Sequence, residues 1–192
     1  ARFRLSTDAT AANPTGVASD GEVEDYPATI MLPGGTVDSG KSKKITHNPF
    51  GGPILAAGDY FGSSVASLGD LDGDGVTDLA VGAHGDDTRG GYVSNRGAMH
   101  VLFMNRAGTV KSSVKIASGT NGGPTLADND RFGSSVASLG DLDGDGVTDL
   151  AVGADELFSS RGAVYVLFLN ANGTVKSSQK IASDTNGGPT LA

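Results

Sequence analysis

The sequence predicts an all-β fold that contains two copies of a four-stranded antiparallel unit. A 23-residue stretch, FGSSVASLGDLDGDGVTDLAVGA, occurs at 61–83 and again at 132–154 without one difference. Short runs rich in β-branched residues follow it in both copies, and turns that use many of the chain's 30 Gly separate them. The dipeptide Asn172-Gly173 lies between two such runs, where it is a strong hairpin signal.

Each copy is predicted to carry four strands. They cover 63–68, 78–83, 97–104 and 110–117 in the first copy, and 134–139, 149–154, 162–169 and 175–182 in the second. Phe132 follows Phe61 by 71 residues, whereas Asn186 follows Asn121 by 65, because the loop after the second strand is six residues shorter in the second copy. Four short antiparallel strands that recur at this spacing predict the blades of a β-propeller.

The loop between the first and second strands reads DLDGDGVTD in both copies and predicts a cation site. At an effective dielectric near 20, two like charges about 4 Å apart repel by roughly 4 kcal/mol, so the carboxylates need a counter-ion if they point inward. Calcium takes six to eight oxygens, which a loop can supply from alternate positions and from a backbone carbonyl at the seventh. The expected ligands are Asp70, Asp72, Asp74, the Val76 carbonyl and Asp78 in the first loop, and Asp141, Asp143, Asp145, the Val147 carbonyl and Asp149 in the second.

The loop is not an EF-hand, although its first half is similar to one. Val81 stands where the bidentate Glu of an EF-hand is expected, and the residues that follow the loop favour a strand over a helix. Magnesium is a weaker candidate than calcium because it retains several waters. The alternative without a metal is a solvated Asp-Gly turn, since these residues favour turns in any case.

The first 44 residues differ in character from the repeats. RFRLS alternates as a half-buried strand does, a turn-rich stretch follows, and GEVEDYPATIML is a second candidate strand. We interpret 1–32 as the C-terminal part of a β domain and 33–44 as a linker. Residues 41–45 resemble the later VKSSVKI and VKSSQKI segments, which predicts a strand of the first blade or of a degenerate preceding repeat.

Composition limits the range of functions. The net charge is −8, and no basic cluster indicates a nucleic-acid partner. The chain has no Cys, no apolar run long enough for a membrane helix and no signal peptide after Ala1. Its last residues repeat those that precede Phe132, so we expect a third repeat to follow in a longer protein.

The propeller part, roughly 45–192, resembles the FG-GAP repeat of integrin α-chain propellers and their bacterial relatives. Phe61-Gly62 and Phe132-Gly133 supply the FG, and the Asp-rich core matches the family pattern. The Pro of the motif is replaced by His84 in one repeat and Asp155 in the other. The resemblance implies a propeller that usually closes with seven blades, and it implies two calcium ions held by the ten residues given above.

The segment before the linker is similar to the C-terminal signature of the GEVED domain, a β-sandwich module of very large secreted or surface proteins of bacteria. The similarity rests on RFRLS followed by DGEVEDY, about thirty residues. Glu22, Glu24 and Asp25 form a possible second cation site, but an acidic, solvent-facing strand edge is the favoured interpretation.

In an up-and-down blade, successive connections alternate between two faces. The variable loops therefore lie opposite the Asp loops, where binding residues are often carried. The longer one offers a candidate ligand-face loop, with a solvated insertion as the equal alternative. Its polar and aromatic residues are His84, Asp86, Asp87, Arg89, Tyr92 and Arg96. His100 is interpreted as a packing residue, because it alternates with Met99 and Val101 in a strand.

These features indicate a calcium-stabilised propeller segment for binding or adhesion outside the cell, with an unknown protein or glycan as ligand. An enzyme is not expected, since there is no Cys nucleophile or GxSxG motif and the Ser pairs are repeated scaffold positions. The alternatives are an accessory propeller of a secreted, phospholipase-like hydrolase and a spacer without a ligand. Two blades cannot close a propeller, so self-assembly of several chains is a further possibility.

Overall fold

The computed structural model describes residues 3–4, 23–24, 43–48, 51–87, 94–156 and 161–190. The chain divides into two units, Ala1–Ser42 and Lys43–Ala192. In the first unit, β1 (Phe3–Arg4) pairs antiparallel with β2 (Val23–Glu24). Both strands fall within the two segments that the sequence predicts to be strands. Glu22 and Asp25 of the proposed acidic site lie outside the described residues.

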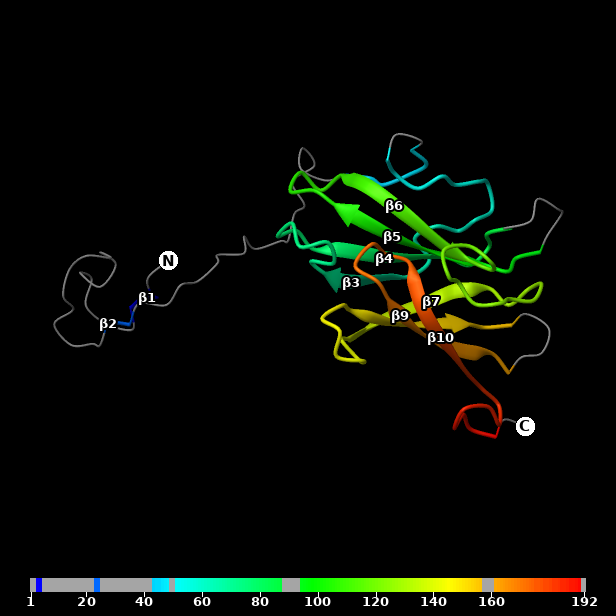
Figure 1. Cartoon of the computed structure of the whole chain (residues 1–192). Helices are drawn as coiled ribbons and strands as arrows, with labels where there is room; N and C mark the ends of the chain where they lie inside the picture. The colour runs from blue at the N-terminus through cyan, green and yellow to red at the C-terminus, as the bar shows by residue number, and fades with distance from the viewer. Residues whose placement is uncertain are drawn as a thin grey trace. The chain divides into compact units, whose positions relative to one another are not determined.

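The second unit contains two four-stranded antiparallel sheets, each formed by one copy of the repeat (Figure 1). We call them blade one and blade two. Blade one has the order β3 (Val65–Gly69), β4 (Asp78–Ala83), β5 (Ala98–Met104) and β6 (Val110–Ala117). Blade two has the same order with β7 (Phe132–Gly140), β8 (Asp149–Ala154), β9 (Ala163–Leu169) and β10 (Val175–Ala182). The all-β prediction with two four-stranded blades is therefore confirmed.

The second and fourth strands of both blades have the predicted bounds, and the third strands begin one residue later than predicted. The first strands differ from one another although their sequences are identical. β7 begins at Phe132, which pairs with Ala154 and bridges Gly97 of blade one, whereas β3 begins only at Val65. The neighbouring blade therefore determines where this strand begins.

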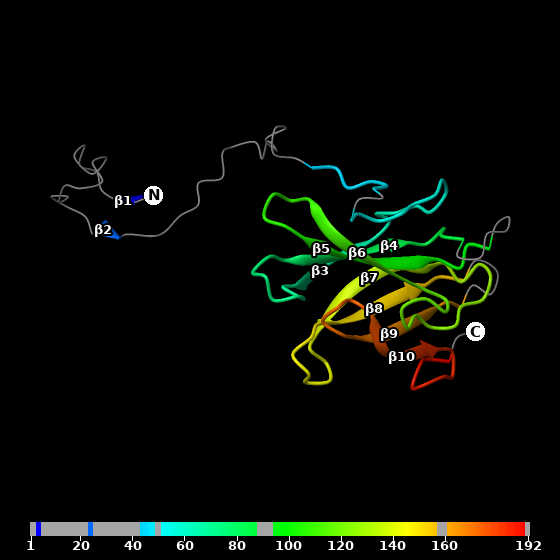
Figure 2. The same ribbon diagram turned by 45° about the horizontal axis from the view of Figure 1, so that its top comes forward.

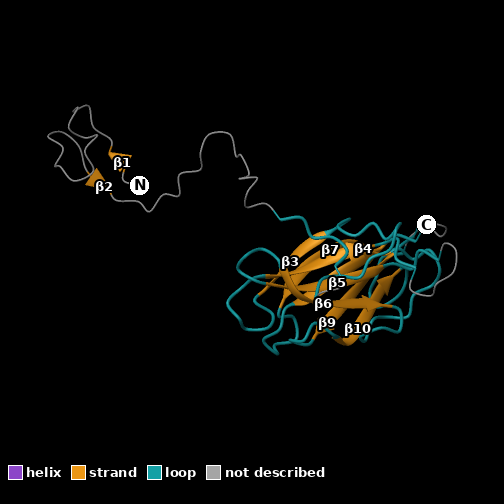
Figure 3. Ribbon diagram, turned by 90° about the horizontal axis from the view of Figure 1, so that it is seen from above, coloured by secondary structure: helices purple, strands orange, loops and turns teal. Residues whose placement is uncertain are grey.

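The core lies between the two blades. β7 runs alongside β3 and β4, and Figure 2 shows the two sheets packed against each other. One apolar cluster joins side chains of both sheets, among them Leu68, Met99 and Ile116 from blade one and Phe132 and Leu150 from blade two. The loops are at the ends of the strands (Figure 3), and both Asp loops lie at the left end of the sheets in Figure 1.

The strand expected at 41–45 is wrong for its described part, since residues 43–48 form no strand. Ile45 instead packs its side chain against the apolar cluster of Val81, Leu102 and Met104, so this segment is held by side-chain contact with the sheet. Within the described residues, no helix has the length and apolar character needed to cross a membrane.

Candidate metal centres

Two Asp loops, 70–78 and 141–149, connect the first and second strands of the blades. Each one turns sharply through two glycines: Gly73 and Gly75 have φ of +77° and +80°, and Gly144 and Gly146 have +81° and +87°. These values fall in the left-handed region, where a side chain is unfavourable. The sequence predicts the sharp turn at the sixth position of the loop, and the structure confirms it.

The first Asp of each loop organises the backbone around itself. The Asp70 carboxylate accepts hydrogen bonds from the N–H groups of Asp74 (2.9 Å) and Gly75 (2.8 Å). Asp141 accepts bonds from Gly144 (2.7 Å), Asp145 (3.0 Å) and Gly146 (2.9 Å). These hydrogen bonds fold the backbone of each loop around its first carboxylate. The fold of the backbone thereby brings other Asp carboxylates of the loop close to the first one.

The last Asp of each loop is fully buried and ties the loop to the third strand. The two Asp78 oxygens accept bonds from the N–H groups of Leu71 (3.0 Å) and Met104 (2.9 Å). Asp149 repeats this arrangement with Leu142 (2.9 Å) and Leu169 (3.0 Å). This Asp therefore has a structural role beside any role as a ligand, because it anchors the loop to β5 or β9.

The carboxylates gather closely enough to share one ion. Oxygens of Asp70, Asp72 and Asp78 lie within 4.8 Å of one another, and so do oxygens of Asp141, Asp143 and Asp145. Calcium is bound by oxygens at about 2.3–2.6 Å, so two of its ligand oxygens are at most about 5 Å apart. The donors are all hard oxygens, and their spacing and chemistry fit calcium.

A lysine that the sequence analysis did not select lies at each cluster. The Lys111 ammonium from β6 is 2.6 Å from Asp72 and also contacts Asp74, and Lys176 from β10 is 2.6 Å from Asp143 and also contacts Asp145. Its hydrogen bonds to Asp72 and Asp74 raise the pKa of Lys111, and the Lys111 contact lowers the pKa of Asp74. The signal was present in the sequence, because Lys occupies the second position of VKSS in both repeats.

Four of the six candidate ligand-face residues lie within the described part, and each contacts another side chain or backbone group of the chain. His84 stacks on the Tyr60 ring (5.0 Å between centroids), and buried Asp86 pairs with Lys115 at 2.6 Å. Asp87 accepts bonds from Ser94 (3.1 Å) and from the Asn95 N–H (2.6 Å), and Arg96 pairs with Asp128 at 2.6 Å. Arg89 and Tyr92 lie outside the described residues.

His100 is a packing residue, as its position in the strand predicts. It is buried in β5, lies edge-on to the Phe61 ring at 5.5 Å between centroids, and neither ring nitrogen has a hydrogen-bond partner. Burial lowers the pKa of His100 to about 4, with a further lowering from the nearby Lys115 and an opposing effect of Asp86. Tyr165 takes the corresponding place in blade two, edge-on to Phe132.

The geometry defines a protein built from propeller-type blades, each with an acidic loop between its first two strands. Residues 61–100 and 132–167 match the FG-GAP repeat. Over 124 residues the chain is 42% identical to integrin alpha-3 of Cricetulus griseus, a match that spans 65% of this chain and 11% of the integrin. It is 38% identical over 141 residues to integrin alpha-V of Gallus gallus, spanning 72% of this chain and 12% of that protein.

A third match, 37% identical over 109 residues, is to integrin alpha-4 of Xenopus laevis and spans 57% of this chain. The chain therefore corresponds to about a tenth of the length of these relatives. Together with the two four-stranded sheets, these matches support an integrin-like FG-GAP β-propeller.

Proposed function

We propose that the chain is a calcium-stabilised propeller segment that serves binding or adhesion outside the cell. The observation that carries the calcium part is the presence of two carboxylate clusters whose oxygens lie within 4.8 Å of one another. Each ion would be held by the four Asp of its loop and the carbonyl of Val76 or Val147. The ion would offset the repulsion between the carboxylates, so that its binding contributes to the free energy of folding.

Calcium removal tests this part. A ligand that binds only the folded state stabilises it by about 4 kcal/mol per site at a thousandfold excess over the dissociation constant. We expect the melting temperature to rise steeply with calcium, to fall in chelator and to respond weakly to magnesium. Asp72→Asn should reduce the stoichiometry measured by calorimetry from two ions to one, and the double variant with Asp143→Asn should abolish the stabilisation. A melting temperature that calcium does not change would leave the loops as solvated Asp-Gly turns.

The adhesion part rests on the similarity to integrin alpha chains and on the blade geometry. We propose that a protein or glycan ligand binds at the face opposite the Asp loops. The sequence predicts that this face carries His84, Asp86, Asp87, Arg89, Tyr92 and Arg96. We further propose a GEVED-type domain remnant at 1–32, a linker at 33–44, the blades at 45–192, and an origin in a large secreted or surface protein of bacterial type.

A screen against immobilised glycans and matrix proteins tests the ligand. Calcium should affect ligand binding only because it stabilises the fold. Asp72→Asn protein that is kept folded, in calcium and below its melting temperature, should therefore still bind the ligand. Arg96→Ala, which breaks the pair with Asp128 on the ligand face, should weaken binding, whereas Arg106→Ala near the Asp loop should leave it unchanged. No captured ligand in such a screen would favour the spacer alternative.

The proposal includes no catalytic role. The repeated Ser pairs have a structural place, because the Ser64 hydroxyl donates to the Gly133 carbonyl of the next blade at 2.8 Å. The alternative of an accessory propeller for a secreted hydrolase predicts a catalytic domain elsewhere in the full-length protein. The sequence of the full gene distinguishes these two roles.

A further inference from the structure

The two Asp loops have the same sequence but different neighbours. Residues 70–78 and 141–149 are identical, and a lysine of the same blade lies 2.6 Å from Asp72 in one loop and from Asp143 in the other. The turn between the third and fourth strands differs, because it reads NRAGT at 105–109 and NANGT at 170–174. Arg106 of blade one therefore has Ala171 as its counterpart in blade two.

Arg106 extends from its turn to the middle of the first Asp loop. A methyl group added at Gly75 would lie 3.4 Å from a guanidinium nitrogen of Arg106. Gly75 is the sixth residue of the loop and directly follows Asp74. At its counterpart Gly146, no atom of the described residues lies within 4 Å of the same position. The first loop therefore has a guanidinium beside it in addition to its lysine, and the described part of the chain places no cation at the corresponding point of the second loop.

The third Asp of the loop is also arranged differently in the two blades. In the second loop, oxygens of Asp145 lie within 4.8 Å of those of Asp141 and Asp143. The counterpart of Asp145 in the first loop is Asp74, which does not belong to the corresponding group of close oxygens. The buried Asp78 takes the third place in that group instead. The carboxylate beside Arg106 is thus the one that differs in position between two identical sequences.

The charge of Arg106 acts on the first loop through space. The pKa of Asp74 is lowered mainly by its hydrogen bond with Lys111, and the positive charge of Arg106 adds to this lowering. The main cause of the lowered pKa of Asp145 is its hydrogen bond with Lys176. An arginine does not lose its proton in a folded protein, so a divalent ion in the first loop is repelled by Arg106 at every working pH.

We propose that Arg106 makes the two calcium sites unequal, so that calcium fills the second Asp loop before the first. This inference rests on the proposed calcium binding and adds an order of filling to it. Lys111 and Lys176 lie at the same distance from their carboxylates, so their effects cancel when the two loops are compared. Arg106 is exposed, and water and salt weaken its repulsion. We expect the first loop to bind calcium roughly two- to fivefold more weakly than the second.

Variants that keep a single intact loop measure each affinity separately. Asp143→Asn retains the first loop, Asp72→Asn retains the second, and calorimetry gives the calcium dissociation constant of each protein. Asp72→Asn protein should bind its ion roughly two- to fivefold more tightly than Asp143→Asn protein. Absence of calcium binding in both proteins overturns the calcium proposal and this inference together. Equal affinities in two proteins that both bind calcium overturn this inference alone.

Exchanging the two turn residues tests whether Arg106 causes the difference. Arg106→Ala in the Asp143→Asn protein should raise the calcium affinity of the first loop nearly to that of the second. Ala171→Arg in the Asp72→Asn protein should lower the affinity of the second loop by a similar factor. Both residues are exposed in turns, so the melting temperature in chelator should stay the same. An affinity of the first loop that Arg106→Ala does not change contradicts the proposed role.

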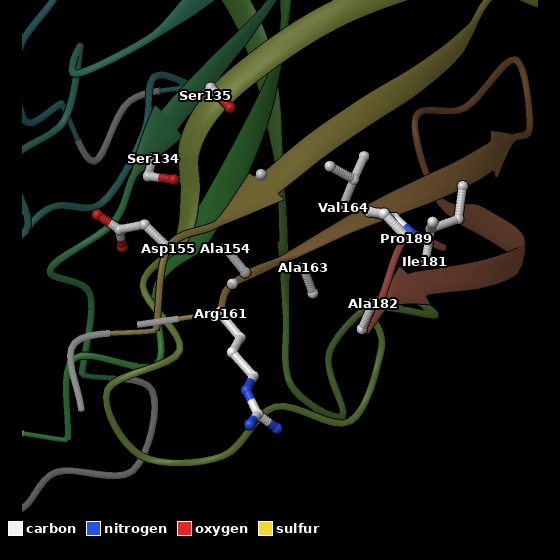
Figure 4. Close-up of a pocket in the computed structure, with 12 residues that line it drawn as sticks. Ser134, Ser135, Ala154, Asp155, Arg161, Ala163, Val164, Ile181, Ala182 and Pro189 are labelled. Atoms are coloured by element: carbon white, nitrogen blue, oxygen red, sulfur yellow. The ribbon is translucent and has the colours of Figure 1, made fainter. Parts of the chain in front are cut away.

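Arg161→Ala is the matched control, because it removes the same charge at a distance from both loops. Arg161 lies near Asp155, where β8 ends and β9 begins (Figure 4), whereas the second Asp loop is at the other end of β8. This variant should leave the affinity of either single-loop protein unchanged, and an increase equal to that of Arg106→Ala would contradict a local effect. Added salt should narrow the difference between the loops, since repulsion through space is screened. A difference that salt does not change would contradict this mechanism.

Discussion

Lys111 places its ammonium 2.6 Å from Asp72, at the carboxylate cluster of the first Asp loop. Lys176 stands at the same distance from Asp143 in the second loop. Each blade therefore carries a positive charge on its fourth strand at the site where calcium is proposed to bind. This charge partly balances the carboxylates, and it would repel a calcium ion that binds beside it.

Removing this ammonium should strengthen calcium binding and weaken the calcium-free protein. We expect Lys111→Met to raise the affinity of the first loop by roughly two- to fivefold, a modest change because the pair is partly exposed to solvent. Its melting temperature in chelator should fall at the same time. Lys180→Met, which removes the pairing of Lys180 with Glu156, is the control. A lower calcium affinity of Lys111→Met, measured by calorimetry, would mean that the lysine supports the site.

The buried Asp78 should matter even without calcium. Asp78→Asn replaces one acceptor oxygen by an NH₂ group that faces the N–H of Leu71 or Met104. Leaving such a buried donor unsatisfied costs about 1–3 kcal/mol, and the lost charge weakens the other bond as well. We expect a loss of about 3 kcal/mol in urea unfolding with chelator present. Asp72→Asn should show a comparable loss only when calcium is present, and equal losses in chelator would refute this division of roles.

His100 should make stability depend on pH. Its pKa is about 4 in the folded chain and about 6.5 when unfolded, so the unfolded chain takes up the proton first as the pH falls. The free energy of unfolding should therefore fall between pH 6.5 and pH 4, by about 3 kcal/mol in total.

The two blades supply a reciprocal pair of variants for this test. His100→Tyr, which copies Tyr165 of blade two, should flatten the pH dependence in this range, and Tyr165→His should steepen it. The measurement is urea unfolding at a series of pH values in chelator. Parallel pH curves for the wild type and His100→Tyr would show that other groups cause the acid sensitivity.

Gly82 and Gly153 occupy the same repeat position and should respond differently to Ala. A methyl group at Gly82 would meet the backbone carbonyl of Gly133 in the next blade, which cannot move away. Overpacking of this kind costs about 1–3 kcal/mol. A methyl group at Gly153 would meet the hydroxyl of Ser135, which can rotate. Thermal unfolding should show Gly82→Ala to be clearly less stable than Gly153→Ala, and equal losses would contradict the close approach of the blades at Gly82.

Repeat spacing and turn residues were enough to predict the four strands of each blade, because the pattern is local. The bounds of β4, β6, β8 and β10 follow from alternation between turns. The different starts of β3 and β7 were not predictable from two identical sequences, since the neighbouring blade decides them. The prediction of a strand at 41–45 was wrong in its described part for a related reason. Similarity to VKSS does not show whether a neighbouring strand is available to pair with this segment.

The Asp loops could be identified from the sequence because four carboxylates in nine residues are unusual. The structural role of Asp78 was not visible, since its partner Met104 lies 26 residues further along the chain. Lys111 was missed because it is 37 residues from Asp74, although its repetition at Lys176 was a usable signal.

The backbone bridge between Phe132 of blade two and Gly97 of blade one has an evolutionary consequence. A duplicated blade brings with it both halves of a junction that is already compatible with its neighbours, so arrays can lengthen by recombination without a new binding surface having to arise. The loops between β4 and β5 and between β8 and β9 differ in length by six residues, whereas the Phe-Gly segment that begins each repeat is identical, so the loops can vary without changing the junction.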